Sequence, residues 1–167
     1  ISGQNSLNFR LMTAMVSAML ICAGGNSLND YFDYEIDRIN KPSKPVPSGK
    51  VTPGEAVLIW VVSSILGIIS GYIISFYNFI VAIITVFLLF LYNRKLKRTV
   101  LSGNFTVSLL TGLAFIYGGL VAENKRLALV PALFSFLFHF GREIVKDLED
   151  VSGDRKAGIN TVATKYS

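Results

Sequence analysis

The stretch from Ala56 to Tyr92, AVLIWVVSSILGIISGYIISFYNFIVAIITVFLLFLY, holds 37 residues without a charged side chain. One membrane-spanning helix needs about 20 predominantly apolar residues, so this stretch is long enough for two of them. A hairpin between the two helices is best placed at SFYN, residues 75–78. The stretch therefore predicts two consecutive membrane-spanning helices joined by a tight turn.

The rest of the chain has the same apolar character. Hydrophobic residues make up 51% of the sequence and charged residues 16%, and the mean hydropathy is +0.51. A soluble domain carries about 25% charged residues, so this composition favours a membrane protein. Further apolar segments run from Asn8 to Leu28, from Thr99 to Ala122 and from Leu127 to about Arg142. The predicted fold class is all-α, a polytopic membrane helical bundle with five spans in this chain.

The basic residues are distributed unequally between the two ends of these spans. If the loops alternate across the membrane, residues 29–55, 93–98 and 142–167 share one face and carry thirteen of the sixteen lysines and arginines. Such a bias marks the cytoplasmic side. It also accounts for the net charge of +5 without a nucleic-acid partner.

Two acidic motifs with the same spacing each follow an apolar segment. The first contributes Asp30, Asp33 and Asp37, and the second, 117 residues later, contributes Asp147, Asp150 and Asp154. On a helix this spacing places the three carboxylates of a motif on one face, together with Asn29 in the first motif. Two carboxylates about 5 Å apart repel by roughly 3 kcal/mol at an effective dielectric near 20. A solvated helix face is the plain alternative, but the repetition favours a bound cation, and oxygen ligands beside a phosphate suit Mg²⁺.

A proline-rich loop follows the first motif. RINKPSKPVPSGKVTPGEA holds four of the five prolines, so the helix carrying the first motif should stop by about Asn40. The remainder is predicted to be an ordered, irregular loop that carries Lys41, Lys44 and Lys50. Its length favours a lid or a binding loop, and the alternative is a basic loop that contacts anionic lipid headgroups.

Acidic motifs next to basic residues at a membrane boundary favour a particular substrate. Divalent ions held by the aspartates, with basic side chains around them, would bind a group rich in anionic oxygens such as a diphosphate. A central cavity among the apolar helices would receive a hydrocarbon chain. Metal ions that neutralise a departing diphosphate lower the barrier to breaking an allylic C–O bond.

Three segments, NDYFDYEID, KPSKPVPSG and REIVKDLEDVSGDRKAG, resemble those of the UbiA-type intramembrane prenyltransferases. In that family the two acidic motifs bind prenyl diphosphate through Mg²⁺. The family has eight or nine helices, so the resemblance implies that this chain lacks helices at both ends. Within the family, NDYFDYEIDRINKP and REIVKDLEDVSGD most resemble the archaeal digeranylgeranylglyceryl phosphate synthases.

The resemblance implies a role for each matching position. Two Mg²⁺ ions would be held by Asn29, Asp30, Asp33, Asp37, Asp147, Asp150 and Asp154. The expected catalytic residues are Asp33, Asp37, Asp150 and Asp154. The expected diphosphate-binding residues are Lys44, Tyr92, Lys95, Lys97, Arg142 and Lys146. Relatives carry Tyr-x-x-x-Lys, but here Leu96 stands four residues after Tyr92, so Lys95 and Lys97 both stay open as the diphosphate-binding lysine.

The implied reaction is Mg²⁺-dependent transfer of a geranylgeranyl group from prenyl diphosphate to a lipophilic acceptor, geranylgeranylglyceryl phosphate, in archaeal ether-lipid synthesis. Transfer to an aromatic quinone precursor is the alternative within the family. A membrane transporter is a further alternative, but it would place acidic residues within the spans rather than at one edge. The bilayer is an expected partner, and the oligomeric state stays open.

These expectations also fix an organisation and a location. The whole of 1–167 is expected to form a single transmembrane prenyltransferase domain in the plasma membrane, with its active site facing the cytoplasm. Residues 1–55 would provide a helix, the first motif and the proline-rich loop. Residues 56–141 would provide four spans, and residues 142–167 the second motif.

Overall fold

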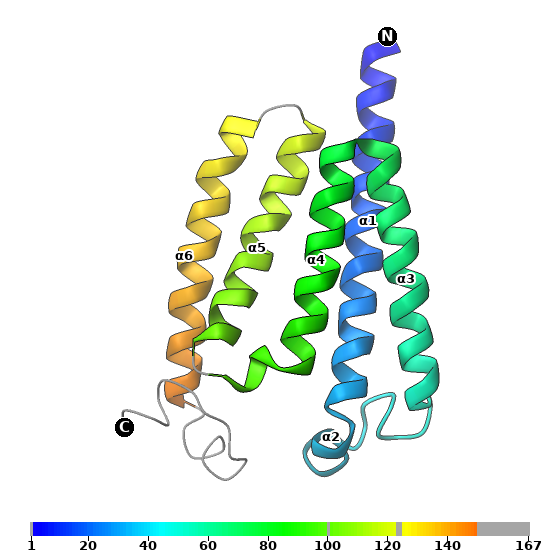
Figure 1. Cartoon of the computed structure of the whole chain (residues 1–167), viewed down its shortest axis with the longest axis vertical. Coiled ribbons are helices and arrows are strands. Elements are labelled where there is room, and N and C mark those ends of the chain that lie inside the picture. Colours follow the sequence, from blue (N-terminus) through cyan, green and yellow to red (C-terminus); the bar gives the residue numbers. More distant parts are fainter. Residues whose placement is uncertain (1, 100, 123–124, 150–167) are drawn as a thin grey trace. The chain divides into compact units, whose positions relative to one another are not determined.

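The computed structural model describes residues 2–99, 101–122 and 125–149, which form helices joined by turns and loops (Figure 1). No strand occurs among these residues. The elements are α1 (Ser2–Phe32), α2 (Tyr34–Asn40), α3 (Pro53–Ile74), α4 (Phe76–Arg94), the 3-10 helix η1 (Leu96–Arg98), α5 (Ser102–Val121) and α6 (Lys125–Glu149). The all-α prediction is confirmed.

Five of the helices are long and apolar enough to cross a membrane. The candidate spans are Asn5–Phe32, Pro53–Ile74, Phe76–Arg94, Ser102–Val121 and Arg126–Lys146. Many of their apolar side chains are exposed, which is the surface that lipid would cover in a polytopic membrane protein. The described residues thus contain the five candidate spans that the sequence predicts.

The hairpin inside the uncharged stretch lies where the sequence predicts it. A single residue, Ser75, separates α3 from α4. The Ser75 hydroxyl accepts a hydrogen bond from the Asn78 backbone N–H at 3.1 Å and donates one to Asn78 Oδ1 at 2.7 Å. The hydroxyl therefore satisfies a backbone donor that the first turn of α4 would otherwise leave unpaired.

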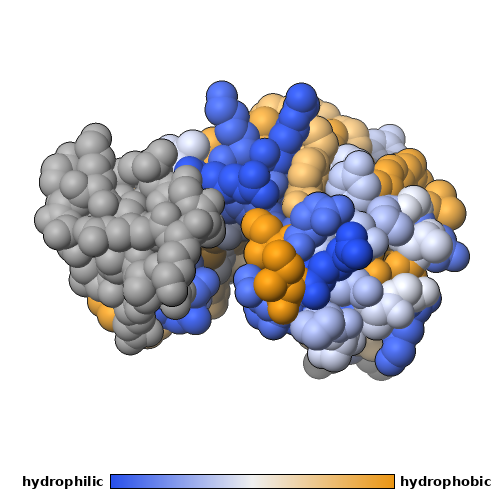
Figure 2. All heavy atoms as spheres, turned by 90° about the horizontal axis from the view of Figure 1, so that it is seen from below, coloured by the Kyte–Doolittle hydropathy of each residue, from blue (hydrophilic) through white to orange (hydrophobic). Residues whose placement is uncertain are grey.

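The chain divides into two compact units, unit 1 (Ile1–Asn93) and unit 2 (Arg94–Ser167). In unit 1, α1 and α3 run side by side, and α2 and the proline-rich loop lie at one end of the pair (Figure 1). Hydrophilic residues gather at that end of unit 1 (Figure 2). In unit 2, α5 and α6 form an antiparallel pair (Figure 1).

Small residues let α1 and α3 approach closely. The Ser17 hydroxyl, which is fully buried, donates a hydrogen bond to the Gly67 carbonyl at 2.8 Å. The Ser27 hydroxyl likewise donates to the Ala56 carbonyl at 2.9 Å. Contacts of this kind between small residues hold helices together where lipid removes the hydrophobic driving force.

We expect Gly67→Ala to destabilise this helix pair. A Cβ atom at Gly67 would lie 2.6 Å from Ile21 Cγ1 and 3.2 Å from the Ser17 carbonyl oxygen, so the Ile21 side chain or the helices would have to shift. Overpacking of this kind costs about 1–3 kcal/mol. The measurement is thermal unfolding of the detergent-solubilised protein. Gly54→Ala is the matched control, because a Cβ atom at Gly54 meets nothing within 4 Å, and it should be neutral or slightly stabilising.

Candidate functional site

The first acidic motif spans a break between two helices. α1 ends at Phe32 and α2 begins at Tyr34, and Asp33 between them has φ −96° and ψ 6°. Backbone hydrogen bonds still run from Asp33 N to Asn29 O at 2.9 Å and from Asp37 N to Asp33 O at 2.8 Å. The motif thus lies on two helices that meet at Asp33, and the helical hydrogen bonds continue through the junction. The predicted end of the helical segment by about Asn40 is confirmed, because α2 ends there.

One lysine of the proline-rich loop joins the two ends of this motif. Lys44 Nζ lies 2.9 Å from Asp30 Oδ1 and 2.7 Å from Asp37 Oδ2. The Asp37 side chain is 7% exposed and that of Lys44 is 28% exposed, so water screens these ion pairs only in part. Burial alone would lower the pKa of Lys44, but the hydrogen bonds to Asp37 and Asp30 outweigh it and raise the pKa. The ammonium group therefore stays charged at neutral pH.

The loop that presents Lys44 is ordered by its own hydrogen bonds, as the sequence predicts. Val46 is 3% exposed and anchors the loop in unit 1. The backbone N–H of Gly49 donates to the Val46 carbonyl at 3.1 Å, and that of Val51 donates to the Pro45 carbonyl at 3.1 Å. Gly49 has a φ of +77°, a left-handed conformation that glycine adopts without strain. The loop ends at a capping box, in which Thr52 starts α3.

A chain of amide groups links the first motif to α4. Asn29 Nδ2 donates to Asn93 Oδ1 at 3.0 Å, and Asn93 Nδ2 donates to the Leu89 carbonyl at 2.9 Å. Asn93 is 3% exposed, which is unusual for a polar residue unless its hydrogen bonds are made. The sequence patterns did not single out Asn93, because it lies 64 residues from Asn29 and belongs to no motif.

Aromatic rings continue from the motif along the helices of unit 1. Phe32 meets Phe90 edge-on with ring centroids 6.5 Å apart, and Phe90 stacks on Trp60 at 5.7 Å. Tyr31 contacts Phe32 edge-on at 5.3 Å. Tyr31 and Phe32 lie between Asp30 and Asp33 in the sequence, so this series of rings begins within the motif.

The first motif has the ligand types that a hard cation needs. Asp30 and Asp37 already converge on one positive charge, the Lys44 ammonium, at hydrogen-bond distance. Carboxylate and amide oxygens are also the ligands of Mg²⁺. In the described part of the chain, however, no three acidic, histidine or cysteine side chains gather closely enough to form a metal cluster by themselves. The residues present therefore fit a metal that would take its further ligands from water and substrate oxygens.

The basic residues expected to bind diphosphate lie at several places. Tyr92 belongs to α4 in unit 1, whereas Lys95 and Lys97 lie at the start of unit 2, before and within η1. Lys95 is exposed and Lys97 is half-buried. Because α4 ends at Arg94, Tyr92 and the two lysines do not share one continuous helix, and the choice between the lysines stays open.

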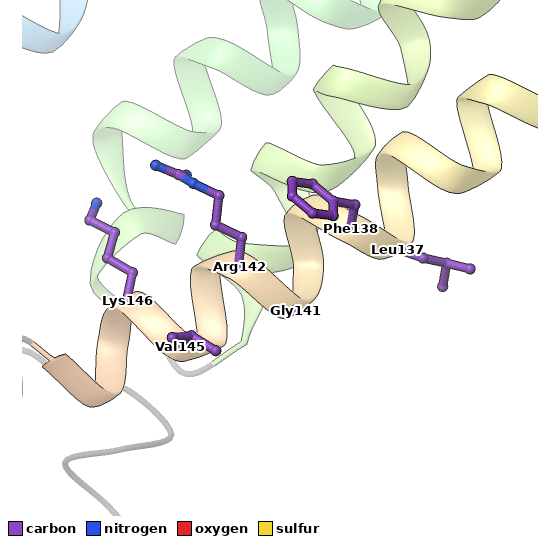
Figure 3. A pocket seen from close by; sticks show the side chains of 6 residues that line it. All are labelled: Leu137, Phe138, Gly141, Arg142, Val145 and Lys146. Atoms are coloured by element: carbon purple, nitrogen blue, oxygen red, sulfur yellow. The ribbon is translucent and has the colours of Figure 1, made fainter.

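The other two basic residues lie on α6 in unit 2. Arg142 and Lys146 line an open hollow together with Leu137, Phe138, Gly141 and Val145 (Figure 3). Figure 3 shows the side chains of Arg142 and Lys146 extending to the same side of the helix. Arg142 Nη1 also lies 2.6 Å from Glu143 Oε1. The hollow is thus lined by two cations and by apolar side chains of the same helix.

The second acidic motif falls at the edge of the described residues. The backbone of Asp147 continues α6, but its side chain is not described. Asp150 and Asp154 lie outside the described residues. Their roles as metal ligands therefore remain predictions.

Comparison with known proteins identifies the relatives of the chain. The sequence pattern of the UbiA prenyltransferase family matches residues 1–167. The digeranylgeranylglyceryl phosphate synthase of Methanosphaera stadtmanae is 38% identical over 162 residues, which is 97% of this chain and 60% of that protein. The enzyme of the same name from Methanocaldococcus jannaschii is 44% identical over 146 residues, which is 87% of this chain and 52% of that protein. The chain thus spans little more than half the length of these relatives.

Two solved structures are similar to this one. The first is described as digeranylgeranylglyceryl phosphate synthase in membranes; it is 41% identical and matches with a TM-score of 0.89 over 95% of this chain and 57% of its own. A UbiA homolog from Aeropyrum pernix K1 is 20% identical and matches with a TM-score of 0.65 over 95% of this chain and 67% of its own. The second similarity concerns the fold alone.

Proposed function

Because the chain belongs to the UbiA prenyltransferase family, we propose that it transfers a prenyl group from a prenyl diphosphate to a lipophilic acceptor. The observation that carries this proposal is that Asp30 and Asp37, at the end of a membrane helix, both contact the Lys44 ammonium group. The names of the similar proteins support geranylgeranyl diphosphate as the donor and geranylgeranylglyceryl phosphate as the acceptor. The product would be an archaeal ether lipid precursor.

In the proposed reaction the allylic C–O bond of the donor breaks and the diphosphate leaves. The acceptor hydroxyl oxygen forms the new C–O bond and loses its proton. Mg²⁺, when bound, supplies the positive charge that stabilises the departing diphosphate. Asn29, Asp33 and Asp37 would hold one ion and Asp150 and Asp154 the other, with Asp30 and Asp147 beside them.

The basic and aromatic residues would assist the same step. The proposed diphosphate-binding residues are Lys44, Tyr92, Lys95 or Lys97, and the α6 residues Arg142 and Lys146. Tyr31 and Phe32 lie within the first motif, between Asp30 and Asp33. Their rings would stabilise positive charge that develops on the allylic carbon, since aromatic faces attract cations.

The product of the reaction tests the acceptor. Purified natural polypeptide would be supplied with geranylgeranyl diphosphate and either geranylgeranylglyceryl phosphate or a hydroxybenzoate, and the products would be analysed by mass spectrometry. We expect a digeranylgeranyl ether from the first acceptor. Prenylation of the hydroxybenzoate alone would replace the proposed acceptor with an aromatic one.

Removal of divalent metal should abolish the activity. The aspartates of a motif repel one another and the diphosphate without a cation, so excess EDTA should stop turnover and excess Mg²⁺ should restore it. The measurement is the initial rate with and without chelator. Full turnover in excess EDTA would contradict metal-dependent transfer.

Both motifs should be accessible only from the cytoplasm. The thirteen basic residues assigned to the same membrane face as the motifs support this orientation. Cysteines introduced at Ser43 and Ser152 in a Cys22→Ser background would be treated with a membrane-impermeant maleimide, since Cys22 is the only native cysteine of the chain. Labelling should require inside-out vesicles, and labelling of intact cells at either position would show that the orientation is wrong.

A further inference from the structure

The amide orientations at the first motif are set by a fixed acceptor in α4. A backbone carbonyl can only accept hydrogen bonds, so the atom of Asn93 that lies 2.9 Å from the Leu89 carbonyl must be the donor Nδ2. Asn93 Oδ1 then faces Asn29, and because an amide oxygen can only accept, it requires the Nδ2 end of Asn29, at 3.0 Å. The backbone of α4 thus determines which end of the Asn29 amide is occupied.

This arrangement leaves the Asn29 oxygen directed away from Asn93. The oxygen and nitrogen of a planar amide diverge, so an amide held by its nitrogen presents its oxygen on the other side. Without Asn93, the amide could rotate and present its N–H₂ group instead. Only the oxygen can bind a cation, so rotation would replace a ligand with a repulsive dipole.

We infer that Asn93 is a positioning residue that holds the Asn29 amide with its oxygen available to the cation of the first motif. The inference rests on the proposed metal-binding function of that motif. Asn93 is 3% exposed and sits on a membrane helix, so it would act through Asn29 and not by touching the substrate. Residues that orient a metal ligand in this way typically account for about 10–100-fold in metal affinity.

The test measures metal affinity without turnover. Mn²⁺ would stand in for Mg²⁺, and its binding to the purified natural polypeptide would be followed by electron paramagnetic resonance in the absence of substrate. The relevant Mn²⁺ ion is the one whose binding is weakened by Asn29→Ala. We expect Asn93→Leu to lower the affinity for that ion by about 10–100-fold. Asn78→Leu is the matched control, because Asn78 is also a buried asparagine of α4 but lies at its opposite end, and it should leave Mn²⁺ affinity unchanged.

A second variant separates orientation from general damage. A carboxylate has an oxygen at both ends, so an aspartate at position 29 needs no orienting partner. In an Asn29→Asp background, Asn93 Oδ1 would face a carboxylate oxygen and could not orient it, so Asn93→Leu should not weaken Mn²⁺ binding there, as a double-mutant cycle would show. Thermal unfolding would be recorded for every variant.

The outcomes distinguish this inference from the proposed function. If the unmodified protein binds no Mn²⁺, or Asn29→Ala leaves binding unchanged, the metal assignment of the motif itself fails. If Mn²⁺ binds through Asn29 but Asn93→Leu has no effect, only the positioning role is overturned. An equal loss of affinity from Asn93→Leu in both backgrounds would also overturn it, because the loss would then come from structural damage and not from amide orientation.

Discussion

Asp33→Ala and Asp150→Ala should each lower the initial rate of prenyl transfer at saturating Mg²⁺ by about 10³-fold or more. Each would remove a ligand of one of the two proposed ions, and neither motif alone could then stabilise both ends of the leaving diphosphate. A loss of this size corresponds to about 4 kcal/mol of transition-state stabilisation. The expected result is a near-complete loss of product with substrate and metal both in excess.

The Asp33 variant should remain folded. Asp33 occupies the N-cap position of α2, but its side chain makes no capping hydrogen bond there, so the substitution removes no cap. Removing one carboxylate from an acidic group also relieves repulsion. Thermal unfolding measured beside the rate would show whether the loss is chemical.

A nearby acidic residue provides the matched control. Glu35 lies two residues after Asp33, and its side chain is 80% exposed and 3.6 Å from Arg38. On α2, position 35 lies about 200° around the helix from Asp37, so Glu35→Gln should lower the rate by less than about tenfold. If Asp150→Ala kept a near-normal rate while Glu35→Gln abolished activity, the proposal that each motif holds one of the two metal ions would be wrong.

The helices and the motif could be predicted because they depend on local sequence. The uncharged stretch from Ala56 to Tyr92 required two spans, and the turn at Ser75 followed from its length. The prolines after Asn40 end the helical segment for a reason that acts within a few residues. In these cases the periodicity and the chemistry of neighbouring residues decide the structure.

The contacts within the site depend on residues far apart in the chain and could not be predicted from spacing. Helical periodicity predicted that Asp30 and Asp37 share a face, but only the folded-back loop brings Lys44 between them. Asn93 likewise reaches Asn29 only through the packing of α4 in unit 1. No pattern in a single sequence specifies which side chains a loop or a neighbouring helix will meet.

The same reason explains the ambiguity at Tyr92. The Tyr-x-x-x-Lys spacing of relatives assumes a continuous helix, in which residues four apart share a face. Here α4 ends at Arg94 and the chain turns into η1. Beyond that point the spacing no longer indicates which of Lys95 and Lys97 faces the same way as Tyr92.

Lys44→Met should lower both activity and stability, and Mg²⁺ should restore part of the stability. Methionine is unbranched and one atom shorter than lysine, and it removes the charge between Asp30 and Asp37. Two repelling carboxylates therefore remain, and the Asp37 side chain is only 7% exposed. Breaking a buried pair costs about 3–5 kcal/mol and a surface pair under 1 kcal/mol, so this partly exposed pair should cost about 2 kcal/mol.

The effect of Mg²⁺ on stability tests whether the metal and Lys44 bind the same carboxylates. In the unmodified protein, Mg²⁺ has to share the carboxylates with the Lys44 ammonium, whereas in Lys44→Met it finds them unneutralised. The Mg²⁺-induced rise in the unfolding temperature should therefore be larger in the variant, since at a given concentration a ligand that binds the folded state more tightly stabilises it more. Lys41 is an exposed lysine of the same loop, and Lys41→Met should change neither the stability nor the Mg²⁺-induced rise in the unfolding temperature. Equal Mg²⁺-induced shifts in Lys44→Met and the unmodified protein would mean that the metal does not bind at Asp30 and Asp37. The convergence of these two carboxylates on Lys44 would then no longer support the proposed function.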